Sequence, residues 1–219
     1  LKLAQAIQAT GKPVVLVLVE GRPRIINRIA EGAKAILMAY NPSNEGGTAI
    51  ADVLFGDVNP SGKLPFTYPR TPNGLINYDH KPFETENTSF GNLAFKPQFA
   101  FGDGLSYTTF AYSDLRLSKP TISGNEELTV NVTVANSGRR AGKEAVLVFV
   151  SDLVASLSPP NKRLRRFAKV SLEPGQNRTL TFTLRRDDLS FIGENNKPIA
   201  EPGEFVVTVG GLSQKFTLK

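Results

Sequence analysis

Residues 38–69 read Met-Ala-Tyr-Asn-Pro-Ser-Asn-Glu-Gly-Gly-Thr-Ala-Ile-Ala-Asp-Val-Leu-Phe-Gly-Asp-Val-Asn-Pro-Ser-Gly-Lys-Leu-Pro-Phe-Thr-Tyr-Pro, and the order of apolar and turn-forming residues here decides the fold. An apolar run at residues 35–39 leads into the stretch and is long enough for a buried strand. Turn-forming residues follow at 41–44, and apolar residues then recur at helical spacing up to Gly56, which is placed to end the helix. A strand, a polar loop and a helix in this order predict an α/β sheet with ligand-facing loops at the carboxyl ends of its strands.

The residues upstream predict a second strand of the same sheet. Val14–Val19 is continuously apolar, which is typical of a strand buried on both faces of a parallel sheet. We expect a helix on either side of it, at residues 1–10 and again around the isoleucines at 25, 26 and 29. Two strands do not complete a sheet, so we expect the rest of the sheet to lie upstream of this sequence.

From residue 111 onward the pattern changes to an alternation with a period of two. Residues 128–134 and 179–184 alternate apolar and polar side chains, as half-buried antiparallel strands do. Further strands are expected at 144–150, 170–172 and 205–209. Short strands separated by turns rich in Gly, Pro and Asn predict a β-sandwich. The expected fold class is therefore an α/β part followed by an all-β part.

The composition excludes several classes of site. The chain has 219 residues, of which 40% are hydrophobic and 21% charged, as in ordinary globular proteins. It has no cysteine, which excludes disulfides and thiolate metal sites, and one histidine, His80, cannot build a multi-histidine metal site. No apolar run approaches the roughly 18 residues that span a bilayer, and the opening residues do not read as a signal peptide. We expect no metal site and no membrane partner.

The net charge of +6 raises the question of a nucleic-acid partner. Basic pairs stand at Arg139-Arg140, Arg165-Arg166 and Arg185-Arg186. Such runs are usually solvated surfaces, and a nucleic-acid interface should also show aromatic stacking positions or a known module. Phe167 is isolated among the basic residues around it, so we expect no nucleic-acid partner. Attraction to an anionic cell surface or polysaccharide is a weaker form of the same idea.

Three motifs in the first half follow one another with almost no gap. They are Asn44-Glu45-Gly46-Gly47, residues 51–57 (Ala-Asp-Val-Leu-Phe-Gly-Asp) and residues 60–65 (Pro-Ser-Gly-Lys-Leu-Pro). Together they resemble the second domain of glycoside hydrolase family 3, typified by β-glucosidases. The passage from Gly11-Lys12-Pro13 to Gly21-Arg22-Pro23 extends the resemblance upstream.

The second half carries motifs of its own. They are residues 136–144 (Asn-Ser-Gly-Arg-Arg-Ala-Gly-Lys-Glu), 150–152 (Val-Ser-Asp), 172–176 (Leu-Glu-Pro-Gly-Gln) and 201–205 (Glu-Pro-Gly-Glu-Phe). These are similar to the fibronectin type III-like domain of the same family, and residues 101–110 resemble the passage that joins the two domains. We therefore expect residues 1–105 to be the C-terminal part of the α/β sandwich domain with its linker, and residues 106–219 to be the fibronectin type III-like domain.

The resemblance implies a function for the whole enzyme. It implies retaining hydrolysis of terminal non-reducing β-D-glucosyl residues of a β-glucoside or β-linked oligosaccharide, by two carboxylates and without a cofactor. In the family, both carboxylates precede the segment that this sequence matches, so no catalytic residue is expected here and the isolated chain should be inactive. Its expected partners are the upstream barrel and α/β domain, and the expected location is the bacterial periplasm or exterior.

Four residues are candidates for contact with a sugar. Asn44 and Glu45 follow a strand at its carboxyl end, where they would reach the rim of a sugar pocket; the alternative is that they cap the following helix and favour its dipole. Tyr78 and His80 lie in the loop nearest to where family members close their active site, and an aromatic ring can stack on a sugar. Their alternative is packing of a surface loop against the neighbouring domain.

Other readings remain open from the sequence. Asp52 and Asp57 are expected to be structural, and the pair Glu84 and Glu86 is a weak candidate for two working carboxylates. A non-catalytic carbohydrate-binding or adhesive β-sandwich module is the main alternative function, although such a module has no need of half a parallel sheet. A basic nucleic-acid binder is the third, and its binding would weaken steeply as salt rises.

Overall fold

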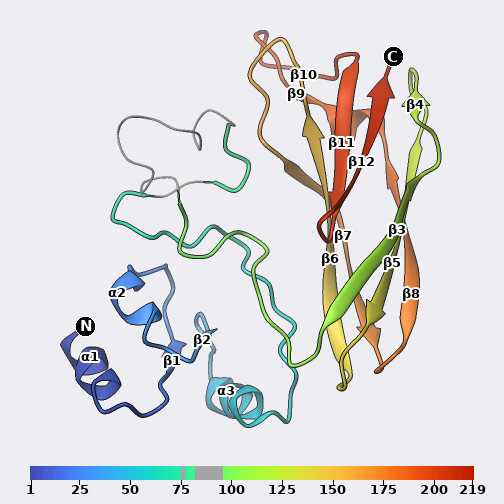
Figure 1. Cartoon of the computed structure of the whole chain (residues 1–219). Helices are drawn as coiled ribbons and strands as arrows, with labels where there is room; N and C mark the ends of the chain where they lie inside the picture. The colour runs from blue at the N-terminus through green and yellow to red at the C-terminus, as the bar shows by residue number, and fades with distance from the viewer. Residues whose placement is uncertain (75–76, 82–95) are drawn as a thin grey trace. The chain divides into compact units, whose positions relative to one another are not determined.

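The computed structural model describes residues 1–74, 77–81 and 96–219 of the chain (Figure 1). Contacts between backbone positions divide it into two compact units. Among the described residues, the first unit contains residues 1–58, 64–74, 77 and 96–103, and the second contains 59–63, 78–81 and 104–219.

The first unit is built on two parallel strands. They are β1 (Val15–Leu18) and β2 (Ala35–Met38), and Val15 lies opposite Ala35. The helices are α1 (Lys2–Gln8), α2 (Asn27–Ala30) and α3 (Gly46–Phe55). The predicted order of strand, helix, strand and helix is confirmed.

Helix α2 is a single turn, although the isoleucine pattern suggested a longer helix. The side-chain amide of Gln8 donates to the Ile29 carbonyl at 2.7 Å, an oxygen that a longer helix would use for its own backbone. A Cβ on Gly32 would lie 2.6 Å from the Gln8 side chain, so the chain passes close to it here. The contact with α1 therefore replaces a second helical turn.

Helix α3 ends where the sequence predicts. Gly56 has a φ of 90° in the left-handed region, and its N–H donates to the carbonyls of Asp52 and Val53. A residue without a Cβ adopts this conformation at little cost, which explains a glycine at the end of the helix.

The second unit is a sandwich of two sheets (Figure 1). One sheet has the strand order β4-β12-β11-β6-β7 and the other β3-β5-β8. The strands are β3 (Phe110–Leu117), β4 (Thr121–Ile122), β5 (Leu128–Asn136), β6 (Gly142–Asp152), β7 (Arg163–Leu172), β8 (Asn177–Leu184), β11 (Gly203–Val209) and β12 (Leu212–Leu218). A short pair, β9 (Phe191–Ile192) and β10 (Pro198–Ile199), follows the 3₁₀ turn η2 (Arg186–Leu189). The expected fold class, an α/β part followed by a β-sandwich, is confirmed.

The core of the sandwich comes from the alternation seen in the sequence. Along β5, every second residue from Leu128 is buried. Its valines meet apolar residues of β6 and β11 from the other sheet in one hydrophobic cluster. Within this cluster, the rings of Phe205 and Phe216 stack with centroids 5.5 Å apart. Burial of this shared apolar surface is the main stabilising contribution to the sandwich.

A buried asparagine organises the turn between β5 and β6. Asn136 is 1% exposed. Its side-chain oxygen accepts hydrogen bonds from the Thr108 hydroxyl at 2.7 Å and the Gly138 N–H at 3.1 Å. Its side-chain nitrogen donates to the carbonyls of Arg140 at 2.7 Å and Leu172 at 3.0 Å. This side chain thereby uses all four of its hydrogen-bonding positions, so the Asn-Ser-Gly motif has a structural role.

Candidate functional site

Two loops meet where the parallel strands of the first unit end. The loop after β1 begins at Val19-Glu20, and the loop after β2 begins at Ala39-Tyr40. The Glu20 N–H donates to the Tyr40 carbonyl at 3.0 Å, which joins them. A Cβ on Gly21 would lie 3.2 Å from the Asn41 side chain, so the loops also pack closely. Ligands of open α/β sheets bind at this end of the strands, which makes it the candidate site.

A buried tyrosine fixes the loop after β1 through hydrogen bonds. Tyr68 is 1% exposed. Its hydroxyl contacts Glu20 Oε1 at 2.8 Å and the Arg24 carbonyl at 2.7 Å, and it accepts from the Arg24 N–H at 3.2 Å. Its ring packs edge-on against Phe99, with centroids 5.9 Å apart. Burial, followed by the hydrogen bond and the negative charge of Glu20, raises the pKa of Tyr68 above its ordinary value. Tyr68 therefore stays protonated and holds the Glu20 carboxylate in place.

The loop after β2 has a constrained backbone. Tyr40 and Ser43 have φ values of 54° and 56°, in the left-handed region that non-glycine residues seldom adopt. A Cβ on Gly46 would lie 2.4 Å from the Pro42 ring, so only glycine fits the start of α3. Local backbone strain of this kind is often found in loops that bind ligands.

The two predicted residues of this loop precede α3. Glu45 occupies the N-cap position, but its side chain makes no capping hydrogen bond. Asn44 and Glu45 are both exposed. Their side chains therefore stand at the carboxyl end of β2 and are open to solvent, as a role in ligand binding requires.

The other two predicted residues belong to the second unit. The Leu164 N–H donates to the Tyr78 hydroxyl at 3.2 Å, and the Tyr78 and Phe149 rings lie edge-to-face with centroids 6.2 Å apart. The His80 carbonyl accepts from the Asn161 N–H at 2.8 Å. Tyr78 and His80 thus pack on the sandwich through these contacts. Glu84 and Glu86 lie outside the described residues.

Sequence reasoning missed three charged residues at this end of β1. Glu20, Arg22 and Arg24 line an open hollow of about 540 Å³ together with Val19 and Gly21. A carboxylate that accepts hydrogen bonds and guanidinium groups that donate them suit a ligand rich in hydroxyl groups. The rule that selected Asn44 and Glu45 would have found Glu20 too, because Glu20 follows the apolar run 14–19 directly.

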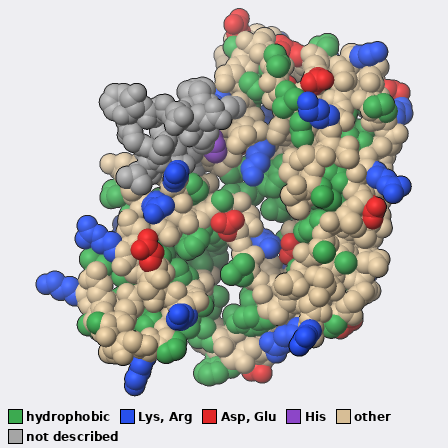
Figure 2. Space-filling model, in the orientation of Figure 1, with side chains coloured by type: hydrophobic (Ala, Val, Ile, Leu, Met, Phe, Trp, Pro, Cys, Tyr) green, Lys and Arg blue, Asp and Glu red, His purple; other side chains and the backbone are tan. Residues whose placement is uncertain are grey.

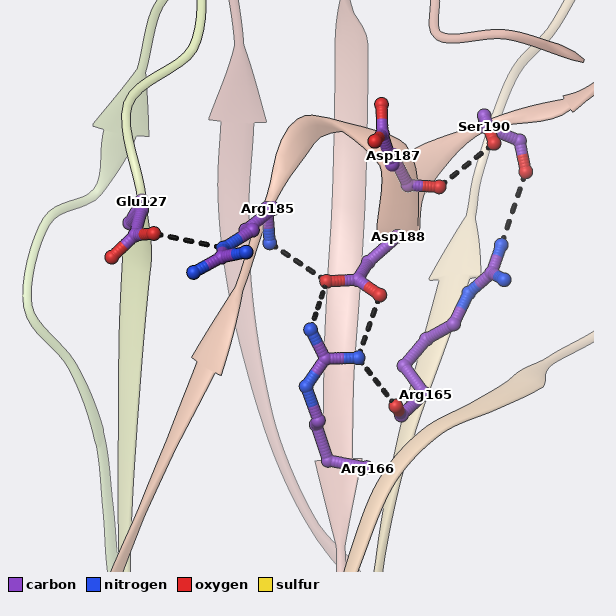
Figure 3. Close-up of polar contacts among 7 residues, drawn as sticks. All are labelled: Glu127, Arg165, Arg166, Arg185, Asp187, Asp188 and Ser190. Atoms are coloured by element: carbon purple, nitrogen blue, oxygen red, sulfur yellow. Dashed lines mark hydrogen bonds and ion pairs between the residues drawn. The ribbon is translucent and has the colours of Figure 1, made fainter.

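Two of the three basic pairs of the sandwich, Arg165-Arg166 and Arg185-Arg186, are engaged in its own contacts. Arg166 on β7 binds Asp188 through both terminal nitrogens, at 2.7 and 2.5 Å, while Arg165 donates to the Ser190 carbonyl at 3.0 Å (Figure 3). Arg185 donates to Glu127 at 2.8 Å. On the face drawn in Figure 2, blue Lys and Arg side chains are spread over the sandwich with red acidic side chains among them. This arrangement is that of a solvated surface with internal ion pairs.

Metal ligands do not gather in the described part of the chain. No three His, Asp or Glu side chains among residues 1–74, 77–81 and 96–219 form a group that could hold a metal ion. No helix among these residues is both long and apolar enough to cross a membrane.

Loss of the Tyr68 hydroxyl should destabilise the first unit. In Tyr68→Phe, the Arg24 backbone and Glu20 lose a buried partner, and we expect the free energy of unfolding to fall by about 1–2 kcal/mol. Because the pKa of Tyr68 is raised on folding, the wild-type chain should lose stability as pH rises above about 10, and the variant should lack this part of the loss. Denaturant unfolding at neutral pH, read by amide exchange in residues 15–24, measures the first effect. Denaturant unfolding followed by circular dichroism at neutral and alkaline pH measures the second.

The matched control is Tyr40→Phe. Tyr40 is 37% exposed and its ring packs against Phe66, a contact that phenylalanine keeps. We expect its free energy of unfolding at neutral pH to change by less than about 0.5 kcal/mol. The comparison is made at neutral pH, because burial raises the pKa of Tyr40 as well. If the two variants were equally stable there, the role assigned to the Tyr68 hydroxyl would be wrong.

Both halves of the chain match known family models. Residues 1–107 match the glycosyl hydrolase family 3 C-terminal domain, and residues 144–213 match a fibronectin type III-like domain. Together the two models account for most of the chain.

Curated relatives resemble the chain over nearly all of its length. It is 46% identical over 220 residues to a lysosomal beta glucosidase of Dictyostelium discoideum, which covers 95% of this chain and 26% of the relative. It is 42% identical over 218 residues to a periplasmic beta-glucosidase of Salmonella typhimurium, covering 95% of this chain and 28% of the relative. A beta-xylosidase of Formosa agariphila is 40% identical over 222 residues, covering 100% of this chain and 31% of the relative. The chain thus spans less than a third of the length of these relatives.

Solved structures are similar to the chain over its whole length. A β-glucosidase from Erythrobacter marinus superposes with a TM-score of 0.92 at 40% identity, over 100% of this chain and 30% of that chain. A mutant β-glucosidase from Listeria innocua, in complex with laminaribiose, superposes with a TM-score of 0.91 at 33% identity, over 100% of this chain and 32% of that chain.

Proposed function

Because this chain belongs to glycoside hydrolase family 3, as its C-terminal portion, we propose that the protein containing it is a β-glucosidase. The reaction would release terminal non-reducing β-D-glucosyl residues with retention of configuration. Its nucleophile and acid/base carboxylates would lie upstream of residue 1, and the reaction would need no cofactor. This chain would complete the sheet, supply loops to the rim of the sugar pocket and brace the domains.

One observation carries this proposal. The match to a β-glucosidase of known structure covers 100% of this chain, with the parallel strands as well as the sandwich, and 30% of that chain. A carbohydrate-binding or adhesive module would give no reason for the two parallel strands and their helices to accompany the sandwich. One continuous segment of a β-glucosidase matches both the α/β part and the sandwich of this chain. This supports a protein with the same order of domains as that enzyme.

The exposed apolar residues of the first unit support an upstream partner. Leu3, Val19 and Phe55 are 75%, 60% and 85% exposed. Ile26 and Tyr68 are the hydrophobic residues of the first unit that are buried within the described part of the chain. A domain with its own core buries many more, so we propose that the preceding barrel and α/β segments cover these residues. We propose the same division into residues 1–105 and 106–219 as the sequence suggested.

The substrate contacts of this chain are also proposed. Asn44 and Glu45, exposed at the carboxyl end of β2, would bind sugar hydroxyl groups, and Glu20 would join them at the end of β1. A substrate role for Tyr78 and His80 stays a prediction, because their described contacts are with the sandwich. The bound laminaribiose of the Listeria innocua enzyme supports a β-linked disaccharide as the kind of substrate.

The location and the sugar belong to the proposal as well. One relative is a periplasmic enzyme, which supports a periplasmic or secreted bacterial location. Another relative is a beta-xylosidase, so a β-xyloside is the competing substrate on the same scaffold.

Activity measurements on the longer protein and on this chain test the function. We expect the longer protein to hydrolyse p-nitrophenyl β-D-glucoside faster than the matching β-xyloside, and the 219-residue chain to give no turnover above background. Faster turnover of the xyloside would contradict the proposed sugar. Turnover by the pure chain, lost on substituting one of its own carboxylates, would contradict the placement of the catalytic groups upstream.

A further inference from the structure

The five residues Asn59–Lys63 lie with the sandwich, although they begin only four residues after the end of α3 in the first unit. The side chain of Asn59 makes three hydrogen bonds there, each at 2.8 Å. Its oxygen accepts from the Ser106 hydroxyl and the Tyr107 N–H, and its nitrogen donates to the Ala141 carbonyl. One amide thus contacts both the residues before β3 and the turn before β6.

Lys63 brings a positive charge to a buried acid. Glu144 on β6 is 7% exposed. The Lys63 ammonium lies 3.4 Å from Glu144 Oε2 and donates to the Gly104 carbonyl at 2.9 Å. Tyr112 on β3 donates to the other carboxylate oxygen of Glu144 at 2.8 Å. A buried carboxylate is costly unless a counter-charge and hydrogen bonds offset its loss of water, and here Lys63 supplies the counter-charge.

The backbone of the sandwich passes very close to Asn59–Lys63 at two glycines. A Cβ on Gly104 would lie 2.3 Å from the Gly62 carbonyl, and a Cβ on Gly142 would lie 2.9 Å from the Asn59 side-chain nitrogen. Neither position has room for any other residue while Asn59–Lys63 is in place. The contact therefore explains the glycine at 104, and together with Thr108 and Phe110 it explains the glycine at 142.

We infer that the sandwich carries a binding surface for an extended peptide with an asparagine and, four residues later, a lysine, and that Asn59–Lys63 occupies this surface as a built-in ligand. Asn59 fixes the position of the segment, and Lys63 neutralises Glu144. A sandwich cut at residue 106 would keep the receptor residues Tyr112 and Glu144 but lose this ligand. The Pro-Ser-Gly-Lys motif accordingly stabilises the domain that follows it in the chain.

Amide hydrogen exchange on the longer protein that contains this chain tests this inference, because it reads each unit separately. Lys63→Met keeps the aliphatic stem and removes the charge, so Glu144 is left without its cation. We expect exchange protection of β5 and β6 to fall at least tenfold, while β1 and β2 change less than threefold. Adding Glu144→Gln to Lys63→Met removes the unpaired charge. The double variant should recover at least half of the lost protection, measured as the logarithm of the protection factor.

The control is Lys119→Met, which removes a lysine from an exposed ion pair with Glu126. We expect less than a threefold change in the same strands, because exposed pairs contribute little to stability. Unchanged protection in Lys63→Met would overturn the inference. So would a double variant with Glu144→Gln that is no better protected than Lys63→Met, since the loss would then not come from the charge on Glu144.

Discussion

Phe205→Ala is expected to lower the free energy of unfolding of the sandwich by about 3–5 kcal/mol. Phe205 is 1% exposed at the centre of the hydrophobic cluster, and its ring stacks on Phe216. Truncation removes the buried ring and leaves a cavity, because a strand held between β6 and β12 cannot move far to fill it. Denaturant unfolding of the full chain, followed by amide exchange in the sandwich strands, gives the value.

Phe167→Ala is the matched control for Phe205→Ala. Phe167 is the same residue type on the edge strand β7, but it is 73% exposed. We expect the free energy of unfolding to change by less than about 0.5 kcal/mol, because this ring is mostly in water in the folded state already. A loss at Phe167 as large as that at Phe205 would contradict the position assigned to the core.

Asn136→Ala is expected to cost the sandwich about 3 kcal/mol, because it removes all four hydrogen bonds of a buried amide. The Thr108 hydroxyl, the Gly138 N–H and the carbonyls of Arg140 and Leu172 all lose their partner. Backbone groups that stay buried without a partner are more costly than an exposed group that water can reach. The same unfolding and exchange measurement applies.

Asn131→Ala provides the comparison for Asn136→Ala. Asn131 lies on the same strand, and its side chain accepts one hydrogen bond, from the Thr181 hydroxyl, in an exposed cross-strand pair. We expect a loss below about 1 kcal/mol. Equal losses at the two positions would show that Asn136 does not organise the turn as described.

The sequence predicted the fold where apolar spacing is regular. Residues 128–134 alternate strictly and form β5, and the apolar runs at 14–19 and 35–39 contain β1 and β2. Strand β7 was predicted only at 170–172, whereas it runs from Arg163. Its first part carries arginines that bind the Ser190 carbonyl and Asp188 instead of packing in the core, so it shows no apolar alternation in the sequence.

The candidate site was predictable in part. The position of Asn44 and Glu45 after a strand followed from the order of elements in a parallel sheet, and the structure places them there. The contact of Glu20 with Tyr68 joins residues that are 48 positions apart in two loops, and no local pattern predicts such a pair. The docking of Asn59–Lys63 on the sandwich was likewise hidden, because the same residues read as an ordinary Pro-Gly turn.

The position of the catalytic carboxylates is the central claim, and covalent labelling of the longer protein tests it most directly. Retaining glycosidases form a glycosyl-enzyme intermediate on their nucleophile. A 2-deoxy-2-fluoro-β-glucoside with a good leaving group slows the breakdown of that intermediate, so that the labelled peptide can be identified by mass spectrometry. We predict a label on an aspartate or glutamate upstream of residue 1 of this chain. A stoichiometric label on a carboxylate within residues 1–219 would contradict the account.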